Sequence, residues 1–261
     1  MDLERWEQPS EGKGIIEPGE VHLWRVRLDG IGVDDAILWG FLSTEEQERA
    51  SRFHFDLHRQ RFLRTHAFNR RLLAHYTSIP AGELEIRSLP EGKPTLAHSN
   101  GLDLRFNLSH SGDLMVLAII RLVDVGVDVE VHSDRLDWHQ IAASYFQDAE
   151  LESLEKIEGD AARLAAFYRL WTMKEAYLKA RGQGIAAGLR QTLVNPKSGF
   201  PPAFESLPGG ENEIRRWQVF LFQPASGASG AVVIERGYEP YHILRYDTGR
   251  SGLLDTASFE K

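Results

Sequence analysis

The chain has 261 residues, of which 42% are apolar and 26% charged, a composition typical of a soluble globular protein. It contains no cysteine, which excludes a disulfide framework and any thiolate metal or redox site. The net charge of −8 disfavours a general nucleic-acid binder. No apolar run approaches the roughly 18 residues that a membrane span needs, and the polar first residues lack the apolar core of a signal peptide. We expect a cytoplasmic protein with no nucleic acid and no membrane among its partners.

The hydrophobic pattern predicts helices alternating with strands. In chain order, we expect a strand over 19–30, a helix from the capping box at Ser43 to about Tyr76, a strand pair over 104–120, a strand over 121–132, helices over 137–157 and 160–181, and strands near 217–223, 230–236 and 241–247. The resulting fold class is α+β.

Positive charge gathers in the first predicted helix. Between Arg49 and His75 there are seven arginines and four histidines, with Asp56 as the single acid. A basic segment in an acidic protein suggests a phosphate or carboxylate ligand. A solvated helix face is the alternative, and composition leaves both open.

A weak internal repeat runs through the sequence. The segments "FLSTEEQERASRF" and "RQRFLRTHAFNRRLLAHY" precede a strand pair, and "YFQDAELESLEKI" and "RLAAFYRLWTMKEAYLKA" precede further strands. We interpret this as two similar α+β halves, a pseudo-dimer with its boundary near 121–132. The predicted units are 1–122, 123–247 and a C-terminal extension, 248–261. Chance similarity between amphipathic helices is the alternative.

Two acids alternate with valines in the stretch "VDVGVDVEV". Asp128 and Glu130 project from one face of the predicted strand, with their carboxylates about 6–7 Å apart. Two like charges on one face favour a cation between them, and oxygen-only ligands suit Mg²⁺. A solvated acidic face on an edge strand is the alternative.

A third acid interrupts the apolar stripe of the helix over 160–181. The stripe runs through Phe167, Trp171 and Leu178, and Glu175 lies within it. An acid that faces a core needs a cationic partner or a metal. A surface ion pair with Lys179, four residues later, accounts for both charges but not for the interrupted stripe. We therefore predict that Glu175 completes a site with Asp128 and Glu130.

A polar stretch separates two apolar segments in "RFNLSHSGDLMVLAII". It contains Asn107 and the run Ser109-His110-Ser111-Gly112. A hairpin turn does not need a histidine between two hydroxyls, although a histidine satisfied within a turn is the simplest structural explanation.

These motifs together resemble those of the 4′-phosphopantetheinyl transferases. "GVDVE" followed by "FYRLWTMKEAYLKARGQG", with "NLSHSGD" and "GKP" upstream, matches the larger surfactin-synthetase-activating type over roughly residues 40–185. The resemblance implies transfer of the phosphopantetheine arm of coenzyme A to a serine of an apo acyl or peptidyl carrier protein, releasing adenosine 3′,5′-bisphosphate. It also implies a pseudo-dimer with the active site between its halves.

The resemblance assigns roles to individual residues. Asp128, Glu130 and Glu175 match the ligands of Mg²⁺, and Glu175 also matches the general base, acting directly or through water. Lys179 matches the residue that contacts the pyrophosphate and assists the leaving group, and Lys174 is expected to be a second phosphate contact.

The remaining assignments concern coenzyme A. Ser109 and His110 match coenzyme A ligands, with His110 near the 3′-phosphate, and Lys93 matches a contact beside the adenine. Asn107 and Ser111 are expected to shape the loop. The basic helix is expected to supply further 3′-phosphate ligands, for which the candidates are Arg52, Arg59 and Arg64.

Two other functions use the same residues. A docking module would keep the coenzyme A pocket but need neither Glu175 nor Lys179. A metal-dependent phosphohydrolase would use the carboxylates without the Ser-His-Ser motif. The segment over 137–160, with Tyr145, Phe146 and Leu151, is either part of the surface that docks the carrier protein or part of the scaffold.

We expect a monomer, because one chain supplies both halves of the site. Whether the client is a fatty-acid, polyketide or nonribosomal-peptide carrier protein stays open.

Overall fold

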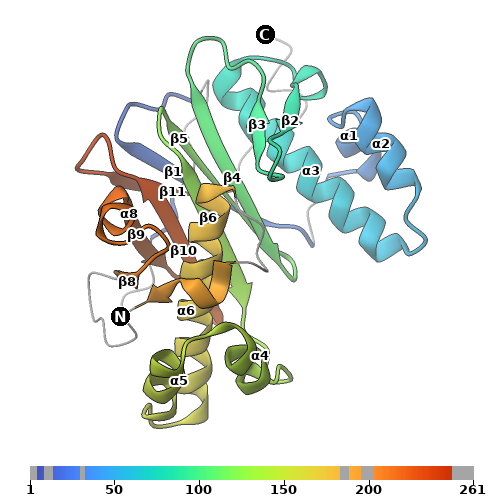
Figure 1. The fold of residues 1–261 in the computed structure, drawn as a ribbon. Coiled ribbons are helices and arrows are strands. Elements are labelled where there is room, and N and C mark those ends of the chain that lie inside the picture. The colour runs from blue at the N-terminus through green and yellow to red at the C-terminus, as the bar shows by residue number, and fades with distance from the viewer. Residues whose placement is uncertain (1–4, 9–13, 30–32, 183–187, 195–202, 249–261) are drawn as a thin grey trace.

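The computed structural model describes residues 5–8, 14–29, 33–182, 188–194 and 203–248. It confirms the α+β class. Two sheets, with strand orders β11-β1-β5-β4 and β6-β10-β9, form the centre of the fold (Figure 1). Their strands are β1 (Glu20–Arg27), β4 (Leu104–Ser111), β5 (Leu114–Arg121), β6 (Val125–Val131), β9 (Trp217–Phe222), β10 (Ala228–Glu235) and β11 (His242–Asp247).

The two sheets are built by the same chain path. In the N-terminal half, β1 is followed by α3 (Asp56–Thr77) and by the β4–β5 hairpin, and β5 pairs antiparallel with both β1 and β4. In the C-terminal half, β6 is followed by α6 (Asp160–Arg181) and by β9 and β10, and β10 pairs antiparallel with both β6 and β9. This equivalence is the structural counterpart of the sequence repeat.

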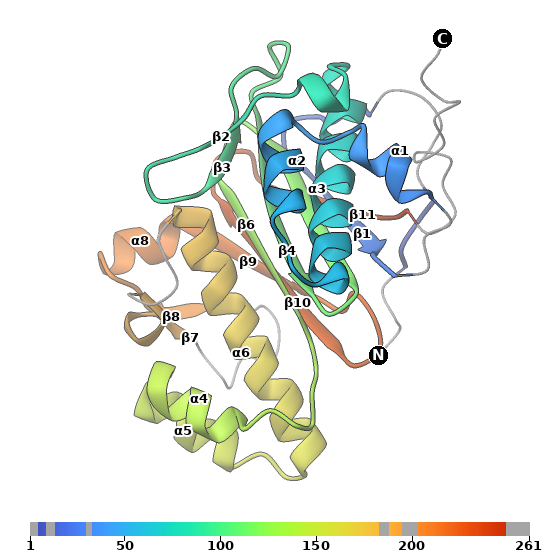
Figure 2. The same cartoon turned by 90° about the vertical axis from the view of Figure 1, so that its right-hand side faces the viewer.

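The halves stack in layers, with α3 and α6 outside the two sheets (Figure 2). Apolar side chains of α3, such as Phe68, pack on one face of the first sheet. The opposite face of that sheet packs on the second sheet, where Val127 of β6 lies in a core with Val116 of β5. Phe167 of α6 belongs to a third core on the outer face of the second sheet. Both faces of β5 are therefore buried, which explains its nearly continuous apolar run, whereas the second face of β6 carries the two acids.

The predicted boundary at 122/123 separates β5 from β6, but the C-terminal half does not end with its own sheet. Strand β11 crosses back and pairs in parallel with β1. Residues 242–247 thus complete the sheet of the N-terminal half. Beyond β11, the predicted extension lies outside the described residues except for Thr248.

Two predicted helices are interrupted. The capping box at Ser43 begins α2 (Thr44–Ser51), but the chain turns after Arg52 so that α2 packs on α3, with Phe53 against Phe62. The helix predicted over 137–157 is split into α4 (Trp138–Tyr145) and α5 (Asp148–Glu155). At this break Phe146 has an extended backbone and a fully buried side chain, so core packing overrides helical continuity.

Short elements complete the described chain. They are α1 (Asp35–Trp39), the 3₁₀ turn η1 (Ala81–Glu83), β2 (Ile86–Ser88), β3 (Pro94–Leu96), the 3₁₀ turn η2 (Leu189–Gln191), β7 (Leu193–Val194), β8 (Phe204–Ser206) and α8 (Glu211–Arg216). Within the described ranges, no helix is long and apolar enough to cross a membrane.

Candidate active site

The polar face of β6 lies directly against α6. The valines at 125, 127 and 129 point into the core between the sheets, so Gly126, Asp128 and Glu130 point the other way. A Cβ atom on Gly126 would lie 2.1 Å from the carbonyl oxygen of Ala176 in α6. Because only glycine permits this approach, the strand acids lie close to the helix.

Glu175 faces these acids from α6, as the interrupted stripe predicts. Glu175 is only 3% exposed, and Asp128 is equally buried. Burial, together with the charges of Asp128 and Glu130 and despite that of Lys179, raises the pKa of Glu175 to about 7. Burial also raises the pKa of Asp128 and of Glu130. Three carboxyl groups thus share a site that disfavours their joint ionisation.

Lys179 neutralises part of this charge. Its Nζ donates to Asp128 Oδ1 at 2.6 Å and to Ser109 Oγ at 3.0 Å, while Ser109 Oγ donates to Asp128 Oδ1 at 2.9 Å. Two buried carboxylate oxygens, Asp128 Oδ2 and Glu175 Oε1, have no hydrogen-bond partner among the described residues. An unsatisfied buried acceptor is costly unless a ligand completes it.

The donor set therefore fits a hard divalent cation. Mg²⁺ prefers carboxylate oxygens and keeps several other ligand positions for water and phosphate. As placed, however, no three acidic or histidine side chains of the described residues form a ready metal cage. The contact between Lys179 and Asp128 occupies one of the carboxylate oxygens that such a cage would use.

The polar stretch around His110 belongs to strand β4. The strand continues through Ser111, and Gly112, with φ of +61°, and Asp113 form the turn before β5. The polar residues are therefore strand positions with alternating faces and not a break between two strands.

One face of β4 joins the two halves of the molecule. Alternate side chains of β4 accept hydrogen bonds from alternate backbone N–H groups of β6. The pairs are Asn107 Oδ1 with Val127 N at 2.8 Å, Ser109 Oγ with Val129 N at 3.3 Å and Ser111 Oγ with Val131 N at 3.1 Å. Ser111 Oγ also donates to Glu130 Oε2 at 2.7 Å. Asn107 and Ser111, predicted to shape a loop, thus hold the acidic strand in register.

The other face of β4 carries His110, which is exposed and surrounded by positive charge. Partial burial, followed by the charges of Lys179, His66 and Arg61, lowers the pKa of His110. His66 is additionally bound to Glu46 through a 2.7 Å contact between Nδ1 and Oε1. Two permanent cations, Lys179 and Arg61, near an exposed histidine are suited to a phosphate.

Lys174 does not belong to this site. Its side chain is 0% exposed, and its Nζ donates to Glu150 Oε2 at 2.6 Å and to the carbonyl oxygen of Leu189 at 3.0 Å. Adjacent residues on a helix point about 100° apart, so Lys174 faces α5 while Glu175 faces β6. We remove Lys174 from the candidate phosphate ligands.

Lys93 lies at the C-terminal end of α6. Its Nζ donates to Asp124 Oδ1 at 2.7 Å and to the carbonyl oxygen of Ala180 at 2.6 Å, and the residue is buried. The ammonium group is therefore engaged with the protein. The predicted contact of Lys93 beside the adenine stays a prediction.

The three arginines predicted to bind the 3′-phosphate are dispersed. Arg64 donates to the carbonyl oxygen of Leu28 and pairs with Asp29 and Asp35, and its binding to the 3′-phosphate stays a prediction. Arg52 is exposed on the turn between α2 and α3, and its role stays a prediction.

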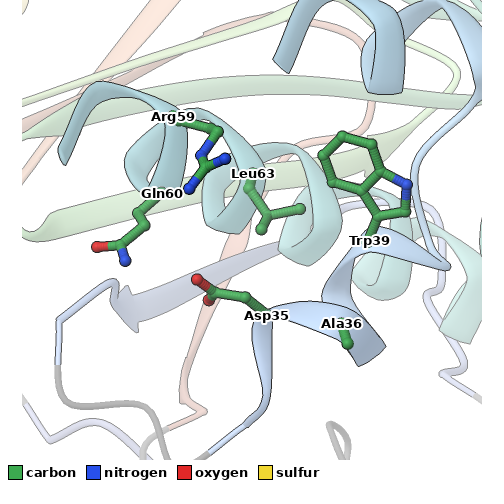
Figure 3. A pocket seen from close by; sticks show the side chains of 6 residues that line it. All are labelled: Asp35, Ala36, Trp39, Arg59, Gln60 and Leu63. Carbon is green, nitrogen blue, oxygen red and sulfur yellow. The ribbon is translucent and has the colours of Figure 1, made fainter. Parts of the chain in front are cut away.

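Arg59 lies elsewhere again, in a shallow hollow between α1 and α3 (Figure 3). The hollow also holds Asp35, whose negative charge disfavours a phosphate there. Arg59 itself is held by Asp56 at 3.0 Å.

Comparison with known proteins gives matches over both halves of the chain. Residues 124–233 match the 4′-phosphopantetheinyl transferase superfamily, and residues 36–121 match the family described as 4′-phosphopantetheinyl transferase, N-terminal. The 4′-phosphopantetheinyl transferase HetI of Nostoc sp. is 38% identical over 223 residues, covering 85% of this chain and 90% of that protein. The chain belongs to the 4′-phosphopantetheinyl transferase superfamily.

Other transferases match shorter segments. The 4′-phosphopantetheinyl transferase AcpT of Salmonella typhi is 45% identical over 113 residues, covering 43% of this chain and 55% of that protein. The human L-aminoadipate-semialdehyde dehydrogenase-phosphopantetheinyl transferase is 28% identical over 158 residues, covering 58% and 51%.

The structure adds a candidate residue of this transferase that the sequence pattern did not single out. Arg61 is near enough to His110 to affect its pKa, and Arg61 Nε is buried with no hydrogen-bond partner among the described residues. In the sequence, Arg61 is one of seven arginines in a helical segment. Only its place on the side of α3 that faces β4 distinguishes it from the others.

Proposed function

We propose that this chain transfers the 4′-phosphopantetheine arm of coenzyme A to a serine hydroxyl of an apo acyl or peptidyl carrier protein, releasing adenosine 3′,5′-bisphosphate. The observation that carries the proposal is the convergence of Asp128, Glu130 and Glu175 beside Lys179, with the cationic surroundings of His110 across β4. The first group suits a cation that would bind the reacting pyrophosphate, and the second suits the 3′-phosphate.

Mg²⁺ held by Asp128, Glu130 and Glu175 is the second part of the proposal. The unsatisfied atoms Asp128 Oδ2 and Glu175 Oε1 support it. When bound, the metal supplies positive charge that stabilises the pyrophosphate as its bridging bond breaks.

The residues of the chain would divide the remaining work. Glu175 accepts the proton of the carrier serine, directly or through a water molecule, as the serine oxygen bonds to phosphorus. The bond between that phosphorus and the bridging oxygen breaks, and Lys179 Nζ stabilises or protonates the departing phosphate. His110 and Arg61 hold the 3′-phosphate and so orient the reacting end.

We also propose that the chain is of the larger surfactin-synthetase-activating type, and that it is a cytoplasmic monomer. The repeated strand order within one chain supports the two-half type. Because Ser109, His110 and the three acids all come from one chain, catalysis needs no second copy. The client carrier is not assigned.

Intact-mass spectrometry of a purified apo carrier protein, after incubation with coenzyme A and Mg²⁺, tests the proposal. We expect a gain of one phosphopantetheine arm that disappears when the metal is chelated. The Glu155→Gln variant, which changes an exposed acid at the end of α5, serves as the control and is expected to retain the reaction. Coenzyme A binding without a mass gain on carriers of several pathways would instead support a docking module.

A further inference from the structure

The ammonium group of Lys179 lies inside the site formed by Asp128, Glu130 and Glu175. Its ammonium group lies 2.6 Å from Asp128 Oδ1 and 3.0 Å from Ser109 Oγ. Its side chain is 23% exposed, whereas the side chain of Asp128 is 4% exposed. The lysine therefore reaches from the edge of the site to a carboxylate at its base.

The ammonium group completes only part of the site. It brings one positive charge to three carboxyl groups, and Asp128 Oδ2 and Glu175 Oε1 stay unpartnered within the described part of the chain. A divalent cation would satisfy more of these oxygens. It would require ligand distances of about 2.0–2.1 Å if it is Mg²⁺, and a second cation on the same Asp128 oxygen would be repelled strongly at such short range.

We propose that Lys179 is a tethered counter-ion, which holds the place of the metal until coenzyme A and the metal enter together. This inference rests on the proposed function. On arrival of the metal, Lys179 leaves Asp128 Oδ1, and its ammonium group moves to the phosphates of coenzyme A.

The geometry gives Lys179 a place to go. The residue lies on the last turn of α6, its stem is flexible, and it already contacts Ser109, the neighbour of His110 in β4. The lysine thus lies between the acids and the cationic surroundings of His110. A phosphate chain that spans these two groups would pass its ammonium group.

The exchange has a thermodynamic consequence. The metal alone has to displace an ion pair, so it binds weakly to the free protein. Coenzyme A offers Lys179 new partners and removes that cost, so coenzyme A and the metal strengthen each other's binding by the same factor.

Binding of Mn²⁺ to the full chain, followed by the loss of the electron paramagnetic resonance signal of the free ion, tests the inference without turnover. In the absence of coenzyme A, we expect Lys179→Met to bind Mn²⁺ more tightly than the unmodified chain by a factor of about 10 or more. Lys179→Arg keeps the charge and is expected to show no such gain. Lys156→Met removes an exposed charge from α5's C-terminal end and should leave the affinity unchanged.

A second measurement uses coenzyme A itself. We expect coenzyme A to increase the Mn²⁺ affinity of the unmodified chain by a larger factor than that of Lys179→Met, because the variant has no ion pair to displace. Circular dichroism checks that each variant is folded. Should Lys179→Met fail to fold, the same comparison is made with Ser109→Ala, which removes one partner of the lysine and is expected to increase the affinity by a smaller factor.

The outcomes separate the inference from the proposed function. Equal or weaker Mn²⁺ binding by a folded Lys179→Met overturns the tethered counter-ion, even where the unmodified chain modifies a carrier protein. Tighter binding supports it, even where no carrier accepts the arm and the proposed function fails.

Discussion

The two halves of the molecule share a chain path but differ in the polar groups at one equivalent contact, where the long helix packs on the first strand. In the N-terminal half, Tyr76 of α3 faces β1, and its hydroxyl oxygen lies 2.7 Å from both Trp24 Nε1 and His22 Nδ1. In the C-terminal half, Glu175 of α6 faces Asp128 and Glu130 of β6. The first group is closed by its own hydrogen bonds, and the second has carboxylate oxygens without partners among the described residues.

This difference separates stability from function within one repeated architecture. A satisfied buried polar group contributes to the fold and needs nothing from outside. An unsatisfied acidic group costs stability and is retained where a ligand can complete it. The same helix-on-strand contact is therefore a structural core in one half and a candidate catalytic centre in the other.

Glu175→Gln is the variant expected to have the largest effect. Loss of the base alone should reduce transfer by about 10²-fold to 10⁴-fold, and loss of a metal ligand adds to this. The protein should remain folded and gain thermal stability, because one of three mutually repelling carboxyl groups is removed. Transfer is measured by mass spectrometry and stability by thermal unfolding; near-normal transfer would remove Glu175 as base and ligand.

His110→Ala tests the cationic side of the site. We expect it to weaken binding of coenzyme A by about 1.5–3 kcal/mol, the usual contribution of a hydrogen bond to a charged group. Binding of 3′-dephospho-coenzyme A should change much less, because the 3′-phosphate is absent. Calorimetric titration with both compounds gives the comparison. Equal losses of affinity for the two compounds would show that His110 contacts a part of coenzyme A other than the 3′-phosphate.

Tyr76→Phe is the matched change in the N-terminal half. Removing the hydroxyl leaves Trp24 Nε1 and His22 Nδ1 without their shared partner, at a cost of about 1–3 kcal/mol in the free energy of unfolding. Transfer per folded molecule should stay unchanged. Urea unfolding and transfer assays measure the two quantities, and a fall in transfer without a fall in stability would break the comparison between the halves.

His75 provides a further expected effect, a dependence of stability on pH. Burial, with the charges of Arg71 and His22, lowers the pKa of His75 to about 4. Because the unfolded state then binds the proton more readily, stability falls as pH falls from about 6.5 towards 4. Urea midpoints at several pH values should show this slope, and His75→Gln should reduce it; an unchanged slope would assign it to other groups.

Parts of the site follow from local patterns in the sequence. Alternation places Asp128 and Glu130 on one face, and the interrupted stripe places Glu175 opposite them. Lys174 was expected to bind phosphate because it adjoins Glu175 in the sequence, but its position around the helix turns it towards α5. Its partner, Glu150, lies on a separate helix and cannot be identified from local spacing.

Long-range strand pairing is the other feature that could not be predicted from the sequence. Nothing local in residues 242–247 indicates that β11 joins β1 in parallel, because that choice depends on the edge left open by the first half. Likewise, Arg61 and Arg64 lie on the same helix, and they differ only in the part of the fold that each one faces: Arg61 lies near His110, and Arg64 binds Leu28. These are properties of the assembled layers, and the sequence pattern carries no separate signal for them.

The contact between β4 and β6 leaves the sequence considerable evolutionary latitude. Since Asn107, Ser109 and Ser111 hold the neighbouring strand with their side chains, the two sheets meet without sharing a backbone ladder. The outer cores under α3 and α6 can then accumulate substitutions almost independently, whereas the core between the sheets is shared by both halves. What has to be inherited together is a short acceptor at every second residue of one strand, because a slip of one position would turn His110 towards the acids.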